Sequence, residues 1–383
     1  MEGNSMSNTQ VVPVLALNAG SSSLKFGLYL VNADATRVLV SGSCETNGDH
    51  GGAIIVRDAL GHTLDGDAKP VGALHGAVDR IFELLAARYL TAPVAIGHRI
   101  VHGGPDCRQH TLIDASVLQR LQAAKIFAPL HVPPALEMIR CAQERFPGVP
   151  QAACLDTAFH AAMPDVARTL PLPRELRMQG IERYGFHGLS CESIVRALGK
   201  DLPQRLVIAH LGHGASVTAI ANGRSIDTSM GLTPSGGVIM STRCGDIDPG
   251  VLEHLVRELG YDAAQLEALI DQQSGMYGIS SLSGDMRELH GAAVSNEDAR
   301  LAIAMFAYSV RKQIASMAAA LGGVDLLVFT GGIGENDPAT RALICEGLDG
   351  LAIRVDSGGV RVMPSQEDEQ IARHAWRLVT AAR

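Results

Sequence analysis

The chain has 383 residues, of which 46% are hydrophobic, 19% charged and only 4% aromatic, and its formal net charge is −8. At roughly 150 residues per domain, this length predicts two domains. Binding of nucleic acid or of an acidic membrane surface requires clustered lysine and arginine, which the sequence lacks. No apolar run approaches the roughly 18 residues of a membrane span, so we expect no membrane partner.

Cysteine content and the first residues indicate the compartment. The seven cysteines are an odd number without a C-x-x-C pair, which argues against a disulfide framework and a zinc site and favours a reducing environment. The first ten residues have neither a basic nor an apolar segment of the kind found in signal peptides. We therefore predict a cytoplasmic protein.

Strand-like and helical segments alternate along the first half, which is typical of α/β layers. A strand, a Gly/Ser turn and a second strand are predicted at residues 11–17, 18–23 and 24–31. Helices are predicted at 73–89 and 135–145, and further strands at 93–97 and 149–155. Near the midpoint the same order of strand, turn and strand is predicted again, at 206–209, 210–215 and 216–221, with Gly20 and Gly212 in equivalent places. This internal similarity suggests a duplication.

The second half is mainly helical until a buried strand near its end. Helices are predicted at 248–259, 263–272, 298–321 and 366–382, and the strand at 324–329. That strand leads into TGGIGEN, at 330–336, and a helix that starts near Pro338. Backbone N–H groups at such a turn are well placed to bind a nucleotide phosphate.

Three glycine-rich turns follow predicted strands, at 18–23, 212–216 and 331–336. Glycine lacks the Cβ that would block the approach of a phosphate group. None of the turns has the G-x-x-x-x-G-K-[ST] or the G-x-G-x-x-G pattern. A single turn of this kind is typical of a tight hairpin, but three in one chain favour phosphate binding.

Two arginines have an unusual setting. Arg99 is predicted just after a strand in GHRIVHGG, and Arg243 on a glycine-rich loop in STRCGDIDPG. A guanidinium group can hold carboxylate and phosphate oxygens bidentately and neutralise charge on a transferring phosphoryl group. Either arginine alone is typical of a structural ion pair, and the loop context favours the ligand-binding interpretation.

Histidines and carboxylates complete the candidate set. His131, His187 and His210 lie at predicted loop or strand ends, where histidine either stabilises a turn or donates to phosphate. His210 and His213 have no third ligand at a spacing that fits zinc. Asp156 ends a strand and can orient a nucleophile or hold Mg²⁺ through water. Glu367, among other acids, is by itself typical of a surface residue.

Together these segments resemble the acetate kinase family. The similar segments are NAGSSSLKF from Asn18, GHRIVHGG from Gly97, APLH from Ala128, DTAFH from Asp156, YGFHG from Tyr184, TSMG from Thr228, TRCGDIDPG from Thr242 and GGIGEN from Gly331. They occur in the family's order and cover residues 14 to about 372, nearly the whole chain.

The resemblance implies an α/β fold of two duplicated actin-like (ribonuclease H-like) domains that flank an active-site cleft. The first domain is expected at 11–156 plus 371–383, and the second, which would bind nucleotide and mediate homodimerisation, at 157–370. The implied reaction is reversible, direct in-line phosphoryl transfer from ATP to acetate, giving acetyl phosphate and ADP. The implied cofactor is Mg²⁺, with Mn²⁺ as a substitute.

The resemblance also implies roles for individual residues. Asn18 and Glu367 would bind the metal, and the expected catalytic residues are Asp156, His187, Arg243, Arg99 and His131. Residues expected at the nucleotide are Asn18, Ser22, Lys25, His210, Gly212, Gly214, Asp285, Met286, Arg287, Gly332, Ile333 and Asn336. Alongside Arg99, the acyl pocket would be formed by Val101, Leu130, Phe186 and Pro234.

Two other functions are weighed against acetate kinase. A propionate or butyrate kinase differs only in its preferred acid, and Val101 favours acetate, although one methylene discriminates by only about 1–3 kcal/mol. A nucleotide-binding protein without transferase activity would have no need of the acyl-side arginine and histidine. The chain departs from the family at His213, Val132 and Gln366, where the family usually has asparagine, and at Met286, where it usually has an aromatic residue.

Overall fold

The computed structural model describes residues 10–20, 23–45, 54–67, 76, 79–83, 92–351, 353 and 358–382. The chain divides into two compact units. The first comprises Met1–Ala158 together with Gln366–Arg383, and the second comprises Phe159–Ser365. The C-terminal segment therefore returns to the unit in which the chain begins.

The first unit contains, among its described residues, an eight-stranded sheet in the order β5-β4-β3-β2-β1-β6-β8-β7. Its strands are β1 (Val12–Ala19), β2 (Ser23–Val31), β3 (Thr36–Glu45), β4 (Ile54–Asp58), β5 (Thr63–Asp67), β6 (Ala95–Ile100), β7 (Thr111–Leu112) and β8 (Gln151–Leu155). Its helices are α2 (Ala115–Ala123), η1 (Ala124–Phe127), α3 (Val132–Arg145), η2 (Ala158–His160), whose last two residues fall in the second unit, and α14 (Glu367–Ala381).

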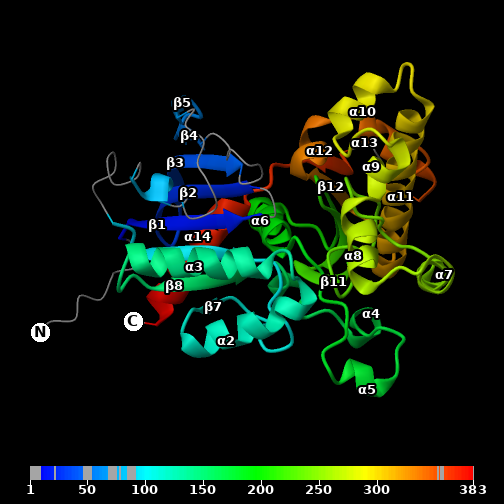
Figure 1. Cartoon of the computed structure of the whole chain (residues 1–383). Coiled ribbons are helices and arrows are strands. Elements are labelled where there is room, and N and C mark those ends of the chain that lie inside the picture. Colours follow the sequence, from blue (N-terminus) through cyan, green and yellow to red (C-terminus); the bar gives the residue numbers. More distant parts are fainter. Residues whose placement is uncertain are drawn as a thin grey trace, which may run out of the picture. The chain divides into compact units, whose positions relative to one another are not determined.

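Helices cover both faces of this sheet (Figure 1). Leu15, Leu17 and Ile96 pack with Met138 of α3 in one hydrophobic core. The alternate residues of the strands point the other way, and Gly97 lies so close to α14 that a Cβ there would be 2.5 Å from Ile371 Cγ2. The side chain of Asn18 belongs to this α14 face.

The second unit contains, in the described part of the chain, a five-stranded sheet in the order β11-β10-β9-β12-β13. Its strands are β9 (Arg205–Leu211), β10 (Ala215–Ala221), β11 (Arg224–Thr228), β12 (Leu326–Thr330) and β13 (Val360–Val362). Its helices are α4 (Asp165–Arg168), α5 (Arg174–Arg177), α6 (Gly188–Leu198), η3 (Gly199–Asp201), α7 (Pro249–Leu259), α8 (Ala263–Gln272), α9 (Gly275–Ser280), α10 (Met286–Ala292), α11 (Glu297–Leu321), α12 (Gly331–Asn336), α13 (Pro338–Cys345) and η4 (Asp349–Leu351).

The two sheets share a topology, which confirms the duplication. In each unit an antiparallel meander of three strands (β1–β2–β3, then β9–β10–β11) is extended by two parallel strands (β6 and β8, then β12 and β13). The strand orders β3-β2-β1-β6-β8 and β11-β10-β9-β12-β13 are therefore equivalent. The α/β fold of two duplicated domains expected from the sequence is present.

Most predicted elements are confirmed, with two corrections. Arg99 lies inside β6, not after it, because that strand continues to Ile100. The glycine-rich segment at 331–336 is not an open turn but the short helix α12. Of the helix predicted at 73–89, residues 76 and 79–83 are helical, and the remainder lies outside the described residues. Within the residues described, no helix is both long and apolar enough to cross a bilayer.

Candidate active site

The first unit brings five polar residues together on the α14 side of its sheet, a group we call the acidic cluster. Asn18 is near the end of β1, Arg99 is in β6, and Asp156 follows β8. Because β1, β6 and β8 are parallel neighbours, the ends of these strands meet at one edge of the sheet. Glu367 and Asp368 open α14, which packs on the same strands.

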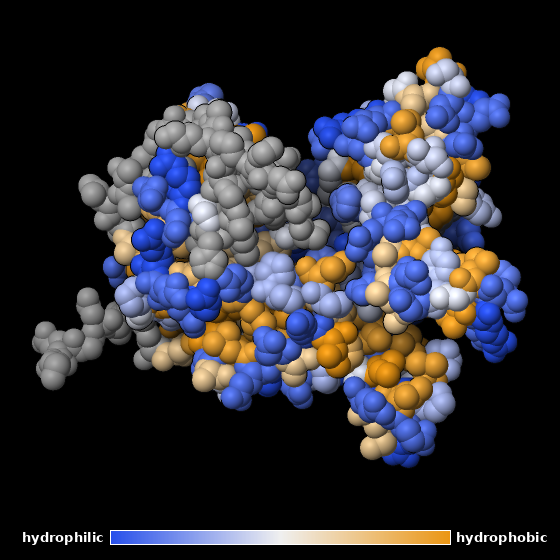
Figure 2. Space-filling view, viewed as in Figure 1, coloured by the Kyte–Doolittle hydropathy of each residue, from blue (hydrophilic) through white to orange (hydrophobic). Residues whose placement is uncertain are grey.

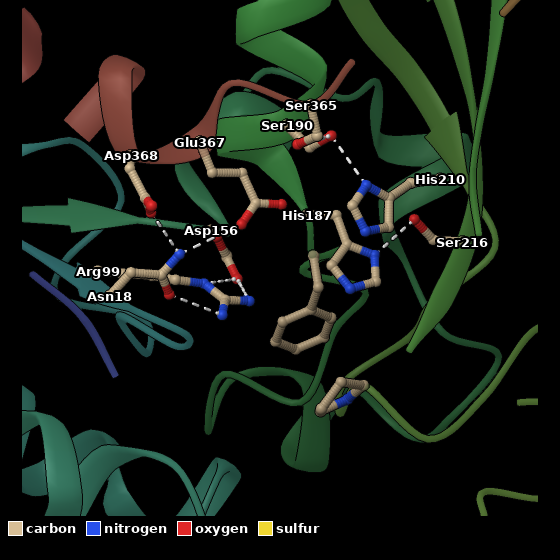
Figure 3. Close-up of polar contacts among 12 residues, drawn as sticks. Asn18, Arg99, Asp156, His187, Ser190, His210, Ser216, Ser365, Glu367 and Asp368 are labelled. Carbon is tan, nitrogen blue, oxygen red and sulfur yellow. Dashed lines mark hydrogen bonds and ion pairs between the residues drawn. The ribbon is translucent and has the colours of Figure 1, made fainter. Parts of the chain in front are cut away.

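Hydrogen bonds and one ion pair hold this cluster (Figure 3). Arg99 donates from Nε and Nη2 to Asp156 Oδ2, at 2.9 and 2.6 Å, and from Nη1 to Asn18 Oδ1 at 3.2 Å. Asn18 Nδ2 donates to Asp368 Oδ1 at 2.8 Å and lies 3.5 Å from Glu367 Oε2. Both Arg99 and Asp156 are thus anchored, and the side chain of Asp156 is 1% exposed.

The acidic cluster contains more carboxyl groups than guanidinium groups. Burial alone would lower the pKa of Arg99, but the neighbouring Asp156 and, next, Glu367 raise it above its usual value. The pKa of Asp368 is raised, chiefly by burial and then by the charge of Glu367, although the Asn18 hydrogen bond opposes this. Two adjacent acids that repel each other provide carboxylate oxygens, the ligands that Mg²⁺ prefers. These residues therefore fit a divalent cation.

In the second unit two stacked histidines face two serines, and we call these four residues the histidine–serine square. The rings of His187 and His210 lie 4.2 Å apart, inclined by 23°. His187 Nδ1 is 3.0 Å from Ser216 Oγ, and His210 Nδ1 is 2.8 Å from Ser190 Oγ (Figure 3). His187 immediately precedes α6, and Ser190 lies in its first turn.

The glycines of the β9–β10 turn leave space beside the rings of the histidine–serine square. A Cβ on Gly214 would lie 3.3 Å from His187 Nε2 and 3.4 Å from Arg243 Nη1. A Cβ on Gly212 would lie 3.7 Å from the backbone nitrogen of Gly332 and 3.9 Å from His210 Nε2. The histidine ring nitrogens and the Arg243 guanidinium group thus approach the turn at its glycines, which have no side chain. This arrangement suits a phosphate group.

A buried histidine fixes the backbone that leads to His187. His160 is 1% exposed, its Nε2 is 3.0 Å from the carbonyl oxygen of Phe186, and its Nδ1 is 2.8 Å from Ser225 Oγ. Because a carbonyl oxygen only accepts, Nε2 carries the ring proton and Ser225 donates to Nδ1. Burial lowers the pKa of His160 to about 4, so the ring is neutral at pH 7.

The turn between β12 and α12 is held by Glu335. Its Oε1 accepts from the backbone nitrogens of Gly331 and Ser365, both at 2.9 Å. Asn336 Nδ2 donates to the carbonyl oxygen of Gly332 at 2.9 Å. The parallel pairing of Thr330 with His210 places this turn beside the β9–β10 turn. Two of the three predicted phosphate turns are therefore neighbours.

The remaining predicted residues have varied positions. Asp285 caps α10 and is paired with the exposed Arg287, which lowers the pKa of Asp285 to about 2. Arg243 donates to the carbonyl oxygen of the buried Pro234 at 3.2 Å. Met286, Phe186 and Val101 are buried, Ile333 and His131 are partly buried, and Lys25 and Leu130 are exposed. Ser22 lies outside the described residues.

The sequence reasoning missed five residues that hold these groups in place, namely Asp368, His160, Ser190, Ser216 and Glu335. Asp368 and Glu335 lie next to predicted residues, and His160 is within DTAFH, so the motifs pointed to them without giving a role. Ser216 ends the predicted turn at 212–216 and Ser190 had no such signal, and the role of both depends on which strand and helix face each other.

The fold and these two constellations define a class, namely kinases built from duplicated α/β domains. The model of the acetokinase family matches residues 13–380. An acetate kinase 2 of Neisseria meningitidis serogroup B is 44% identical over 352 residues, which are 90% of this chain and 88% of that protein.

Solved structures agree with this assignment. A propionate kinase from Francisella tularensis has a TM-score of 0.88 at 35% identity, and a Porphyromonas gingivalis acetate kinase has 0.84 at 34%. Each comparison covers 96% of this chain and 100% of the other. The chain belongs to the acetokinase family.

Proposed function

We propose that this protein is an acetate kinase, which transfers the γ-phosphoryl group of ATP to acetate reversibly and directly, giving acetyl phosphate and ADP. Family membership over nearly the whole chain supports the reaction. The observation that carries the proposal for this chain is the convergence of His187 Nε2 and Arg243 Nη1 on Gly214 of the β9–β10 turn, which has no side chain. A carboxylate is already a nucleophile, so the enzyme has to align two anions and neutralise their repulsion.

Each constellation has a part in this proposal. Arg243 and His187 would donate to the transferring phosphoryl group, and His210, Gly212 and Gly214 would bind the nucleotide phosphates. Arg99, anchored by Asp156, would hold the acetate carboxylate. The residues proposed for the adenosine are Asp285, Met286, Arg287, Gly332, Ile333 and Asn336, and Ser22, Lys25 and His131 are proposed as supporting contacts.

Asn18 and Glu367, with Asp368 beside them, would hold Mg²⁺, or Mn²⁺ in its place. When bound, the cation would neutralise phosphate charge. The pKa of Asp368, raised chiefly by burial and then by the charge of Glu367, supports this assignment, because such a carboxylate favours a proton when no cation is bound. A reaction that consumes ATP, in a chain whose seven cysteines form no disulfide, supports a cytoplasmic location.

Propionate is the second candidate substrate, because one of the similar solved structures is that of a propionate kinase. The proposed acyl pocket consists of Val101, Leu130, Phe186 and Pro234. A methylene group changes discrimination by about 1–3 kcal/mol, so we expect propionate to react more slowly than acetate.

We also propose a homodimer that forms through the second unit. Helix α7 has no buried residue, yet Val251, Val256 and Leu259, which are 41, 47 and 60% exposed, lie along it. On the face shown in Figure 2, hydrophobic residues are visible around this helix. A Leu259→Lys variant would sediment as a monomer in analytical ultracentrifugation, whereas an unchanged sedimentation coefficient would exclude α7 from the interface.

The test of the reaction is acyl-phosphate formation with Mg²⁺ and ATP, trapped by hydroxylamine, with acetate, propionate and butyrate in parallel. We expect the highest rate with acetate, and for Arg243→Ala a loss of at least about 100-fold, as when one oxyanion donor is removed. Arg224→Ala, which removes an exposed arginine of the same unit, is the matched control. Nucleotide binding without any trapped product would favour the non-catalytic interpretation.

A further inference from the structure

The histidine–serine square is built by the start of α6 and by the β9–β10 hairpin. His187 and Ser190 are three residues apart at the start of α6, so they lie on one side of the helix. His210 and Ser216 are directly paired across the β9–β10 ladder, so they lie side by side on one sheet face. The histidine of each element is bonded to the serine of the other.

A third serine, Ser365, is hydrogen-bonded to Ser190. Ser365 Oγ donates to Ser190 Oγ at 3.1 Å. Because Ser190 Oγ accepts this bond, its own hydrogen is available for His210 Nδ1, 2.8 Å away. When Ser190 donates this hydrogen, Nδ1 of a neutral His210 carries no proton and the ring proton is on Nε2. That atom is the one near Gly212 of the β9–β10 turn.

His187 also has a serine hydroxyl group at its Nδ1, and its backbone is strained. Its φ of 58° is one of three positive φ values found in non-glycine residues of the described chain, and such a conformation is unfavourable for a residue with a side chain. Its Nδ1 faces Ser216 Oγ, and its Nε2 faces the Gly214 turn beside Arg243 Nη1. With a phosphoryl oxygen as the shared acceptor, both Nε2 and Nη1 have to be donors.

We propose that Ser190 and Ser216 are positioning residues that keep His187 and His210 in the Nε2–H tautomer, so that both rings donate to phosphoryl oxygens. The inference rests on the phosphoryl transfer proposed above. A hydroxyl partner suits this role better than a carboxylate, because a carboxylate would favour the imidazolium form, and two stacked imidazolium rings would repel each other. Arg243 then supplies the positive charge.

The square is also connected to the nucleotide turn. Ser365, which donates to Ser190, donates its backbone N–H to Glu335 Oε1, and the same oxygen accepts from Gly331. One chain of hydrogen bonds therefore runs from the start of α12 to the ring of His210. The same groups therefore fix both the position of the turn between β12 and α12 and the tautomer of the His210 ring.

The direct test is ¹⁵N NMR of the full-length protein labelled at histidine, with the two rings assigned by the signals lost in His187→Gln and His210→Gln. We expect, in the neutral state, a protonated Nε2 and an unprotonated Nδ1 for both rings. Ser216→Ala should shift the Nδ1 signal of His187, and Ser190→Ala that of His210. A proton found on Nδ1 of either ring in the wild type would overturn the proposal.

Kinetics give the second test. We expect kcat to fall about tenfold in Ser190→Ala and in Ser216→Ala, the effect of one misdirected hydrogen bond, with little change in KM for ATP. Ser216→Thr, which keeps the hydroxyl, should recover activity. Ser193→Ala is the matched control, since Ser193 is a buried serine of α6 that donates to the Ser190 carbonyl oxygen.

The outcomes separate this proposal from the one on which it rests. Serine variants as active as Ser193→Ala would overturn the positioning role even if the wild type makes acetyl phosphate. If the wild type makes none, the proposed function fails, while the ¹⁵N signals still decide the tautomers. A circular dichroism spectrum identical to that of the wild type excludes misfolding as the cause of lost activity.

Discussion

Asp368 has a carboxylate whose charged form is unfavourable in the metal-free protein. Its carboxylate is next to that of Glu367, and burial with this like charge raises its pKa. The folded protein therefore binds a proton at Asp368 more tightly than the unfolded chain does. In the absence of metal, the contribution of Asp368 to the free energy of unfolding therefore decreases as the pH rises through the range in which its carboxyl group loses the proton.

We therefore expect metal-free Asp368→Asn to have a higher Tm than the metal-free wild type at pH 7.5. The difference should narrow as the pH falls, because the wild-type carboxyl group takes up a proton. Mg²⁺ should raise the Tm of the wild type more than that of the variant. Differential scanning calorimetry with and without Mg²⁺ measures this, and Asp201→Asn, at an exposed site, is the control. Equal Mg²⁺ shifts in wild type and variant would remove Asp368 from the cation site.

At the residue scale, the sequence singled out most side chains of the acidic cluster but not how they are held. Asn18, Arg99 and Asp156 were each recognised. The ion pair of Arg99 with Asp156 agrees with a purely structural role for that arginine as well as with a ligand-binding role. Ser190 and Ser216 were missed. Their partners are set by the packing of α6 on β9 and β10, which no local pattern specifies.

At the scale of elements, the segment that ends in His187 depends on one glycine. Gly185 has φ +74°, and a Cβ there would lie 2.6 Å from Thr228 Cγ2 and 2.7 Å from His160 Cγ. The loop thus packs against β11 and against the histidine that holds Phe186 in place. Any side chain at this position would move the loop and with it the start of α6.

Gly185→Ala should cost about 2–4 kcal/mol, the sum of an unfavourable positive φ and steric overlap, and should lower kcat by displacing His187. Gly260→Ala is the matched control, because Gly260 has φ +71° but open space around it. Urea unfolding and steady-state rates measure both effects. A Gly185→Ala variant no less stable than Gly260→Ala would mean that the loop relaxes without cost.

Long periodic helices were predicted to within about a residue, for example α8 and α11, because their apolar stripes span many turns. The short helices α4, α5, α9 and α10 were missed, since four to seven residues carry too little periodicity. Helix α12 was taken for an open turn because glycine disfavours helix, and here Glu335 binds the backbone N–H of Gly331 instead.

At the scale of the whole molecule, each unit contains a buried neutral histidine. His98 in the first unit is hydrogen-bonded to Gln151 at 2.7 Å, and burial lowers its pKa to about 4. His160 in the second unit has a pKa lowered to about 4 for the same reason. Because these values lie below the usual 6.5, the stability that the neutral rings give is complete above pH 6.5 and decreases as the pH falls toward 4.

Both units should therefore be destabilised by acid, each histidine by up to about 3 kcal/mol at pH 4. We expect the Tm to fall between pH 6.5 and 4, and the fall to be smaller in His98→Gln. The exposed His254 provides the control His254→Gln, in which the pH dependence should stay as in the wild type. Identical slopes for all three proteins in calorimetry would contradict a neutral, buried His98.

The return of α14 to the first unit has a consequence for biosynthesis. The second unit is one continuous stretch, Phe159–Ser365, whereas the first is completed only by residues that follow it. During translation the second unit is available in full while the face of the first sheet around Gly97, where Ile371 packs, is still without its helix. We expect the later-made unit to reach its native state on the ribosome first, and the strands made earliest to be the last to acquire a complete core.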